Sequence, residues 1–196
     1  MSNELEIEHR SGTSIVRFTR PEIRNSLSVT VLEQLDVLLD ELNGDTKTVI
    51  FTGTGDAFAS GADLREIAGV TADTAKEFAL RGQRLMTKID ALPCLTIAAI
   101  NGYCFGGALD LALVCKHRIA SANATFAHPG AGLGIITGWG GTQRLPRLIG
   151  QASALEMFFT ASPISAEMAF QIGLIDRISE DILTDSLAYI ANDSSS

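Results

Sequence analysis

The sequence predicts a single α/β domain, because buried strands and helices alternate along the chain. The runs "TVIFTG" and "LTIAAI" are short and apolar, which is typical of buried strands. Between them, residues 74–92 show the apolar spacing of a helix, which we expect to stop at Pro93. With 46% hydrophobic and 19% charged residues, the composition is that of a globular protein. No low-complexity linker divides the chain, so we expect one domain over residues 1–196.

Two strands and a helix are expected at the start of the chain. The segments "LEIEH" and "SIVRFTR" alternate apolar and polar residues and are joined at Ser11-Gly12. Pro21 ends the second strand, and a helix with Ser28 as its N-cap follows. The apolar positions with helical spacing in this segment are Val31, Leu32, Leu35, Leu38, Leu39 and Leu42.

After the strand "LTIAAI" the predicted elements are mainly helical. A tight turn leads into the helix "ALDLALV", and a stretch with six glycines, "AHPGAGLGIITGWGG", occupies residues 127–141. A strand near "LIDRI" and a last short helix are expected close to the end. The remaining helical patterns cover residues 142–149, 152–160 and 165–172.

Two segments of the chain repeat the same order of features. Both "VIFTGTGDAFASGADL" and "IAAINGYCFGGALDL" contain a buried strand, a turn, a glycine and an apolar segment with an aspartate. In each, a glycine (Gly61 or Gly107) stands at the opening of a helical turn, where backbone N–H groups are free. If the two units stack, their amides converge, which is the geometry of an oxyanion hole. The alternative is two ordinary strand-to-helix turns.

Composition and motifs exclude several classes of function. The formal net charge is −8, and no basic stripe is present, which disfavours nucleic acid as a partner. Nucleotide-binding GxGxxG, Walker A and hydrolase GxSxG motifs are absent. The acidic start "MSNELEIEHR" lacks the features of a signal peptide. Reduced, buried thiols, no metal site and a cytoplasmic location are expected from the unpaired spacing of Cys94, Cys104 and Cys115.

One apolar stretch is long enough to cross a bilayer. From residue 94 to residue 115 the only charged side chain is Asp110. Asn101-Gly102 and Gly106-Gly107 interrupt this stretch, and irregular backbone is not tolerated in lipid. We therefore expect a buried strand, a turn and a buried helix, and no membrane partner.

Four motifs in order resemble the crotonase (enoyl-CoA hydratase/isomerase) superfamily, and the resemblance extends from about residue 5 to residue 190. It implies a ClpP/crotonase-like spiral of repeated ββα units, assembled as a homo-trimer or hexamer. It also implies an enzyme that binds acyl-CoA thioesters, with coenzyme A as part of the substrate and no permanently bound cofactor. The motifs are "AFASGADLREI", "IAAINGYCFGGALDLAL", "GGTQRLPRLIG" and "SAEMAFQIGLIDRI".

The resemblance assigns the oxyanion hole to the backbone N–H groups of Ala62 and Gly107. A side chain at residue 107 is expected to crowd the thioester carbonyl, whereas Ala62 tolerates substitution because its donor is backbone. Arg65 occupies the position where family members often have a basic residue near the coenzyme's phosphates. Arg24 is a second candidate for this role. The predicted substrate-binding residues are Arg24, Ala59, Ser60, Gly61, Ala62, Asp63, Leu64, Arg65, Gly106, Gly130, Gly138 and Trp139.

The acid/base residues implied by the resemblance are incomplete. Asp110 aligns with the first of two catalytic carboxylates, although glutamate is usual there, and its apolar neighbours are expected to raise its pKa. The second carboxylate belongs in F-x-x-P-E, where this chain has Gly130. His128 is the nearest titratable group and is either a proton donor or a structural residue. If the cavity is otherwise intact, Gly130→Glu is expected to raise hydratase activity.

The resemblance therefore leaves several functions open. The nominal function is enoyl-CoA hydratase/isomerase, acting on a fatty or short acyl-CoA of undetermined chain length. The missing glutamate and a shortened or absent C-terminal helical lid and trimerisation region also allow a non-catalytic acyl-CoA-binding or assembly protein. A crotonase-fold decarboxylase or thioesterase, which needs a single acid, is another alternative. A ClpP-like peptidase would need Ser60 as its nucleophile and is disfavoured.

Overall fold

The computed structural model describes residues 4–42 and 44–193, and its strands form two sheets. In the described residues the larger sheet has the order β1-β2-β3-β5-β7-β10, antiparallel at β1/β2 and parallel elsewhere. Its strands are β1 (Leu5–Arg10), β2 (Thr13–Phe18), β3 (Thr48–Thr52), β5 (Leu95–Ile100), β7 (His117–Ser121) and β10 (Arg177–Ser179). The smaller sheet contains β4 (Ala57–Ala59), β6 (Tyr103–Phe105), β8 (Thr125–Ala127) and β9 (Ile164–Ser165).

The same ββα unit recurs along the chain, as predicted. In each repeat the first strand (β3, β5 or β7) joins the larger sheet and the second (β4, β6 or β8) joins the smaller one. Helical segments then follow: α2 (Leu64–Ala68) with α3 (Ala72–Asp90), α4 (Gly107–Val114), and the 3-10 turn η2 (Pro129–Leu133) with α5 (Gly141–Ile149). Because β4 and β6 are parallel neighbours, the turns after them lie at the same edge of the smaller sheet. This placement brings the predicted oxyanion residues together.

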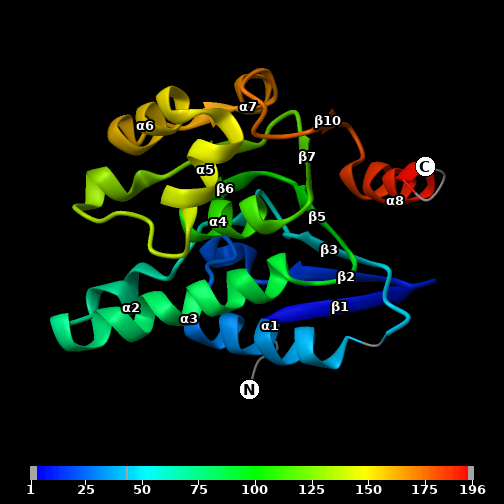
Figure 1. Cartoon of the computed structure of the whole chain (residues 1–196), viewed down its shortest axis with the longest axis horizontal. Helices are drawn as coiled ribbons and strands as arrows, with labels where there is room; N and C mark the ends of the chain where they lie inside the picture. The colour runs from blue at the N-terminus through cyan, green and yellow to red at the C-terminus, as the bar shows by residue number, and fades with distance from the viewer. Residues whose placement is uncertain (1–3, 43, 194–196) are drawn as a thin grey trace.

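Helices cover both faces of the larger sheet (Figure 1). On one side, α1 (Val29–Glu41), α3 and α4 pack into the main core with Phe51 and Ile100. On the other, α8 (Ile182–Asp193) packs Leu183 against a smaller cluster around Ile97. In Figure 1, α6 (Gln151–Thr160) and α7 (Ala166–Gln171) lie at the top of the molecule, opposite α1. The chain thus forms layers with α4 near the centre.

Local sequence signals explain most of the helix boundaries. The Ser28 hydroxyl accepts a hydrogen bond from the Val31 N–H at 3.2 Å, so the predicted N-cap is confirmed. The helix expected over residues 74–92 begins earlier, at Ala72, because Thr71 and Thr74 form a reciprocal capping box. The helix expected over residues 165–172 is shorter, Ala166–Gln171, since residues 164 and 165 pair with β8.

The apolar stretch at residues 94–115 folds as a strand, a turn and a helix inside the protein. Its strand is β5, its turn contains β6, and every residue of α4 from Ala108 to Val114 is buried. Cys104 and Cys115 are buried free thiols, and Cys94 is partly buried. Among the described residues, no helix combines the length and apolar character needed to cross a bilayer.

Candidate active site

A cavity of about 300 Å³ opens where the turns after β4 and β6 face the glycine-rich segment 129–138. Helices α2 and α3 supply the remaining wall, mostly with apolar side chains such as Ile67 and Phe78. The predicted residues that line this cavity are Ser60, Gly61, Ala62, Leu64, Gly106, Gly107, His128, Gly130, Gly138 and Trp139. Arg24, Ala59, Asp63, Arg65 and Asp110 are not part of the lining.

The two predicted oxyanion amides lie on one wall of the cavity. Gly107 is the first residue of α4, where a backbone N–H has no partner within its helix. Among the described residues, the Ala62 N–H makes no backbone hydrogen bond. The turns are in close contact, since a Cβ on Gly61 would lie 2.9 Å from the Gly107 nitrogen. Both amides are therefore without a backbone partner in the described structure, and their convergence on one ligand atom as an oxyanion hole stays a prediction.

The reason for glycine at position 107 differs from the one expected. A Cβ there would lie 2.3 Å from the Trp139 ring, so the indole takes the space that had been assigned to the thioester. Trp139 is only 3% exposed, and its other edge lies against Gly82, where a Cβ would be 2.2 Å from the ring. Gly82 on α3 and Gly107 on α4 thus leave space for the Trp139 ring. The ring in turn packs against the first turn of α4.

Asp110 lies behind the cavity wall with its side chain fully buried. The Thr137 hydroxyl donates a hydrogen bond to Oδ2, whereas Oδ1 has no hydrogen-bond partner in the described structure. Burial raises the pKa of Asp110 from its ordinary 3.8 to about 6, although the Thr137 hydrogen bond, nearby amides and the Arg144 charge oppose this shift. The direction agrees with the sequence-based expectation.

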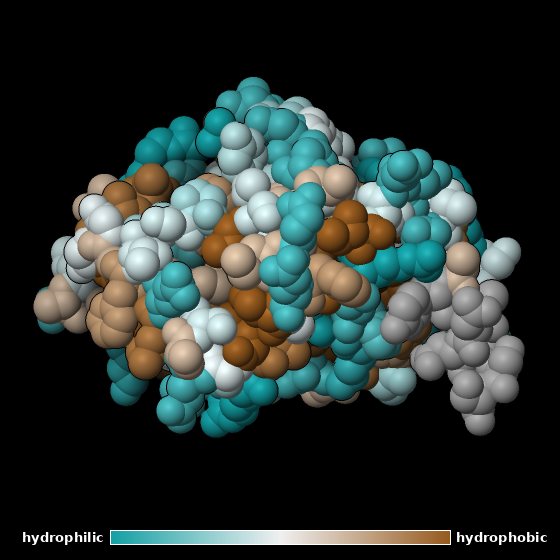
Figure 2. Space-filling view, turned by 90° about the horizontal axis from the view of Figure 1, so that it is seen from above, coloured by the Kyte–Doolittle hydropathy of each residue, from teal (hydrophilic) through white to brown (hydrophobic). Residues whose placement is uncertain are grey.

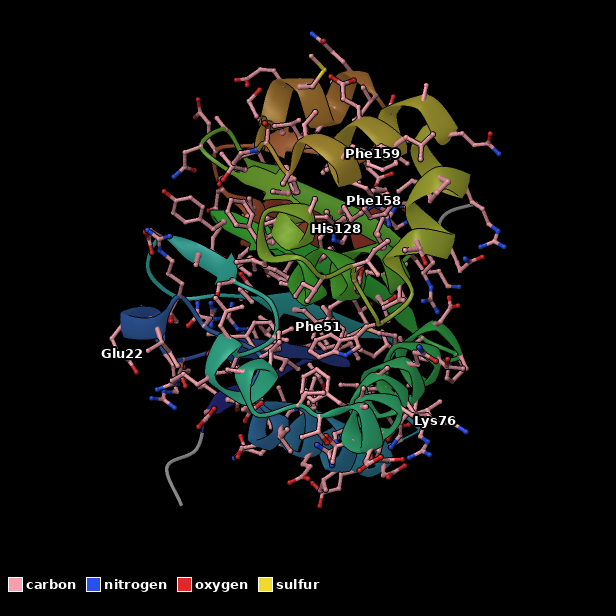
Figure 3. The ribbon with its side chains drawn as sticks, turned by 90° about the vertical axis from the view of Figure 1, so that its left-hand side faces the viewer. Glu22, Phe51, Lys76, His128, Phe158 and Phe159 are labelled. Atoms are coloured by element: carbon pink, nitrogen blue, oxygen red, sulfur yellow. The ribbon has the colours of Figure 1, made fainter. Side chains whose placement is uncertain are left out.

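His128 stands between Asp110 and the cavity. Its Nε2 lies 3.7 Å from Asp110 Oδ1, and neither ring nitrogen has a hydrogen-bond partner among the described residues. Figure 3 shows His128 beneath Phe158 of α6, and the two ring centroids are 5.0 Å apart. Burial lowers the pKa of His128 from 6.5 to about 4, so the imidazole is neutral near pH 7.

Sequence reasoning missed Thr137 as a partner of Asp110. Thr137 is a polar residue in the apolar run "GIITG", but a hydroxyl in a glycine-rich loop is too common to indicate its partner. The contact joins positions 27 residues apart, and it depends on how the segment 129–138 folds back over α4.

Of the residues that the structure describes, no carboxylate lines the cavity in place of the missing glutamate, and Gly130 is closely covered by its own loop. The Gly130 carbonyl accepts a hydrogen bond from the Ile135 N–H at 2.9 Å. A Cβ on Gly130 would lie 2.5 Å from the Ile135 carbonyl oxygen, closer than real Cβ atoms come. Adding a Cβ at residue 130 would therefore require this turn to move, which weighs against the gain in activity expected from Gly130→Glu.

The two arginines proposed for coenzyme binding lie outside the cavity. Arg65 is 73% exposed in its side chain and pairs with Asp63 at 2.6 Å, and Asp63 also caps α2. The Arg24 guanidinium lies 4.4 Å from the centre of the Tyr103 ring. Ala59 is buried inside β4. In the described residues, no group of three His, Cys, Asp or Glu side chains is suited to a metal ion.

The buried pair makes two opposite contributions to stability as the pH changes. Because the pKa of His128 is lowered, the unfolded chain binds more protons between pH 4 and 6.5, and stability is lost as the pH falls through this range. Because the pKa of Asp110 is raised, the folded chain binds more protons between pH 3.8 and 6, and stability is lost as the pH rises. In the wild type these contributions therefore oppose each other.

We expect single substitutions to separate the two contributions. Between pH 6.5 and 4, Asp110→Asn should lose unfolding free energy relative to wild type, and His128→Gln should gain it. Each relative change should be roughly 1–3 kcal/mol, because one pKa unit corresponds to about 1.4 kcal/mol. Urea unfolding at three pH values in this range measures both slopes. Equal slopes in the two variants would contradict the opposed shifts.

The sequence matches one protein family and is similar to curated hydratases. The family described as enoyl-CoA hydratase/isomerase matches residues 8–191. The chain is 36% identical over 181 residues to the short-chain-enoyl-CoA hydratase of Clostridium acetobutylicum, covering 91% of this chain and 69% of that protein. It is 38% identical to the crotonyl-CoA hydratase of Syntrophomonas wolfei, covering 88% and 67% of the two chains.

Solved structures show the same similarity. An enoyl-CoA hydratase from Bacillus anthracis superposes with a TM-score of 0.90 at 35% identity, covering 98% of this chain and 76% of that one. The Pseudomonas aeruginosa protein DspI gives a TM-score of 0.93 at 31% identity, with coverages of 100% and 82%.

Proposed function

Because this chain belongs to the enoyl-CoA hydratase/isomerase family, we propose that it is an enzyme that adds water across the 2,3 double bond of an enoyl-CoA thioester. One observation carries this proposal: an apolar cavity has two free backbone amides on one wall and a buried His128–Asp110 pair beside them. Such a cavity can hold an acyl group, receive negative charge and exchange a proton.

In the proposed reaction, the amides of Ala62 and Gly107 donate hydrogen bonds to the thioester oxygen. Attack of water at C3 moves electrons onto this oxygen and forms an enolate. The amides are fixed by the backbone before reaction, so they stabilise the new charge without reorganising, which is commonly the largest contribution of such a site. Protonation at C2 then completes the 3-hydroxyacyl product.

The lining of the cavity supports an uncharged acyl group as substrate. Within the described part of the chain, His128 is the only titratable residue among those that form the wall. A carboxylate on the acyl chain would lose its hydration without gaining a cationic partner, which is costly. This argues against decarboxylation of an acyl group that carries a carboxylate. The two curated relatives reported above are named as hydratases, which likewise does not favour a binding protein or a thioesterase.

The polar part of coenzyme A is proposed to lie at the mouth of the cavity, near Leu64 and Arg65. Leu64 lines the cavity and is exposed, and Arg65 follows it on α2. Asp63 already pairs with Arg65, so an incoming phosphate would share or displace this ion pair. No cofactor beyond the substrate is required by the proposed reaction.

Assembly into a cytoplasmic homo-trimer or hexamer remains part of the proposal. The top of the molecule in Figure 1, seen face-on in Figure 2, exposes hydrophobic side chains among polar ones. Phe159 on α6 is 77% exposed, and Phe170 on α7 and Leu155 on α6 are also exposed. Apolar residues exposed in this number support a contact with another chain. The free thiols are compatible with a reducing compartment.

We expect the purified protein to hydrate crotonyl-CoA, measured by loss of the ultraviolet absorbance of the conjugated thioester. Glutaconyl-CoA, which adds a carboxylate to the same enoyl group, should react at least ~10-fold more slowly in kcat/KM, because that charge enters an apolar cavity. Competition binding of the saturated thioesters serves as the control for substrate entry. Binding of crotonyl-CoA without detectable hydration would contradict the proposal and favour an acyl-CoA-binding protein.

A further inference from the structure

We propose that His128 is the proton-transfer group of this cavity and that Asp110 is a positioning residue that holds it. The inference rests on the proposed function and deepens it, because it identifies which side chain replaces the acid absent at residue 130. It also reverses the roles predicted from the sequence, in which Asp110 acts directly on the substrate and His128 is secondary.

His128 lies nearer to the cavity than Asp110 does. His128 forms part of the cavity wall, whereas Asp110 does not, so a bound acyl group meets the imidazole before the carboxylate. Asp110 Oδ1 and both ring nitrogens of His128 are buried without hydrogen-bond partners in the described structure. Buried polar atoms without partners are rare in folded proteins, and three of them here occupy one place. Such a cluster is suited to hydrogen bonds that form when a ligand binds.

The Asp110 carboxylate faces His128. Thr137 binds Oδ2 and leaves Oδ1 directed at Nε2, which lies 3.7 Å away. Catalytic hydrogen bonds are often longer in ligand-free structures and tighten in the complex. Gly141 provides the space for the pair, since a Cβ there would lie 2.1 Å from Oδ1 and 3.1 Å from the His128 ring. Thr137 and Gly141, which belong to one segment, thus set the orientation of Asp110.

The polar and charged groups around Asp110 and His128 determine which ring nitrogen of His128 carries the proton. Asp110 faces His128, the Thr137 hydroxyl, the amides of Trp139 and Gly141 and, at longer range, Arg144 and the Cys104 thiol. His128 is packed against the uncharged Phe158 ring, so Asp110 is its only close ionisable neighbour among the described residues. A carboxylate beside Nε2 favours the tautomer with a proton on that nitrogen and leaves Nδ1 as the acceptor. It also stabilises the imidazolium that forms when Nδ1 takes a proton.

These properties define a balanced reaction step. The water oxygen bonds to C3 while one water proton moves to His128 Nδ1. The electron pair of the C2=C3 bond moves into the thioester, and the enolate oxygen is bound by the amides of Ala62 and Gly107. The imidazolium then returns that proton to C2, which restores neutral His128 and releases a 3-hydroxyacyl thioester. One water is consumed, and no other reactant is needed.

The tautomer of His128 tests the pair without any assay of activity. Nitrogen-15 NMR at pH 8 distinguishes the two neutral forms, and the His128 signal is identified by its loss in His128→Gln. We expect the Nε2–H form in the wild type and in Asp110→Asn, which retains an acceptor oxygen. In Asp110→Leu, which removes both acceptors and keeps the branching at Cγ, this preference should disappear. An Nδ1–H form in the wild type, or an unchanged tautomer in Asp110→Leu, would overturn the proposal.

Steady-state kinetics test which of the two residues transfers the proton to and from the substrate. His128→Gln should lower kcat for crotonyl-CoA by about 10²–10⁴ with KM changed only a few-fold, the usual cost of losing a general acid/base. Asp110→Asn should also lower kcat rather than raise KM, but by no more than His128→Gln. His9→Gln, which changes a histidine on β1 far from the cavity, is the matched control and should retain wild-type rates.

The kinetic and NMR results distinguish catalytic from structural roles of His128 and Asp110. If His128→Gln binds thioesters and keeps kcat within about threefold of wild type, the imidazole only packs against Phe158 and the proposal is wrong. A much larger loss in Asp110→Asn than in His128→Gln would return the catalytic role to the carboxylate. If His128→Gln does not fold, the Asp110 variants still decide the pairing through the tautomer. A wild type that fails to hydrate any enoyl-CoA overturns the proposed function, whereas the tautomer result separately decides whether Asp110 holds His128.

Discussion

Gly107→Ala is expected to lower kcat for hydration by about 10²–10³, the usual cost of losing one oxyanion-hole donor. The added Cβ would lie 2.3 Å from the Trp139 ring, which cannot move away because Gly82 closes the opposite side. The strain must therefore be relieved by moving the first turn of α4, and the residue 107 amide moves with it. Overpacking of this kind also costs about 1–3 kcal/mol of stability.

A second substitution in the same variant tests this explanation. Trp139→Val removes the six-membered ring that the new methyl group meets. The double variant should therefore have a higher kcat than Gly107→Ala, and this gain should exceed any change in kcat that Trp139→Val causes alone. Gly132→Ala is the matched control, because nothing lies within 4 Å of its added Cβ. Steady-state kinetics and urea unfolding on the wild type, the two single variants, the double variant and Gly132→Ala measure the two effects separately. If Gly107→Ala keeps full kcat, or if Trp139→Val fails to relieve it, Trp139 does not support the oxyanion amide.

The sequence was sufficient to predict the parts of the site that depend on local patterns. Gly61 and Gly107 follow similar strand and turn signals, and the parallel pairing of β4 with β6 brings them together as expected. The buried position of Asp110 followed from its apolar neighbours in a short helix, and the raised pKa followed from burial. In each case the signal that predicts the feature is a short stretch of the sequence.

The unpredicted parts depend on how distant segments pack. Trp139 fills the space beside Gly107, and Thr137 binds Asp110, because the segment after η2 folds back over α4. No periodicity marks such contacts, since glycine-rich backbone adopts many conformations before tertiary packing selects one. The resemblance led us to consider residue 130 as a missing carboxylate and as part of the substrate-binding wall, without regard to its own loop. The structure shows instead a tight loop around it, and this changes the expected effect of restoring the acid.

Gly130→Glu is therefore expected to lower hydratase activity rather than raise it. The new Cβ would lie 2.5 Å from the Ile135 carbonyl oxygen and 3.2 Å from its carbon, both backbone atoms that cannot rotate away. Opening this turn would also break the hydrogen bond from the Ile135 N–H to the Gly130 carbonyl. We expect a loss of about 1–3 kcal/mol in stability from overpacking. Because the same segment carries Thr137, the contact with Asp110 should be disturbed as well.

Two comparisons separate the steric effect from that of the charge. Gly130→Ala adds the Cβ without a carboxylate and should lose most of the same stability, whereas Gly132→Glu adds the carboxylate where nothing lies within 4 Å and should be close to wild type. Urea unfolding and crotonyl-CoA hydration measure both quantities for the three variants. A gain in kcat for Gly130→Glu at unchanged stability would mean that the turn opens at little cost and that a second carboxylate is what the site lacks. A loss shared with Gly130→Ala would instead mean that the loop excludes the second acid, which leaves His128 as the group placed to exchange a proton with the substrate.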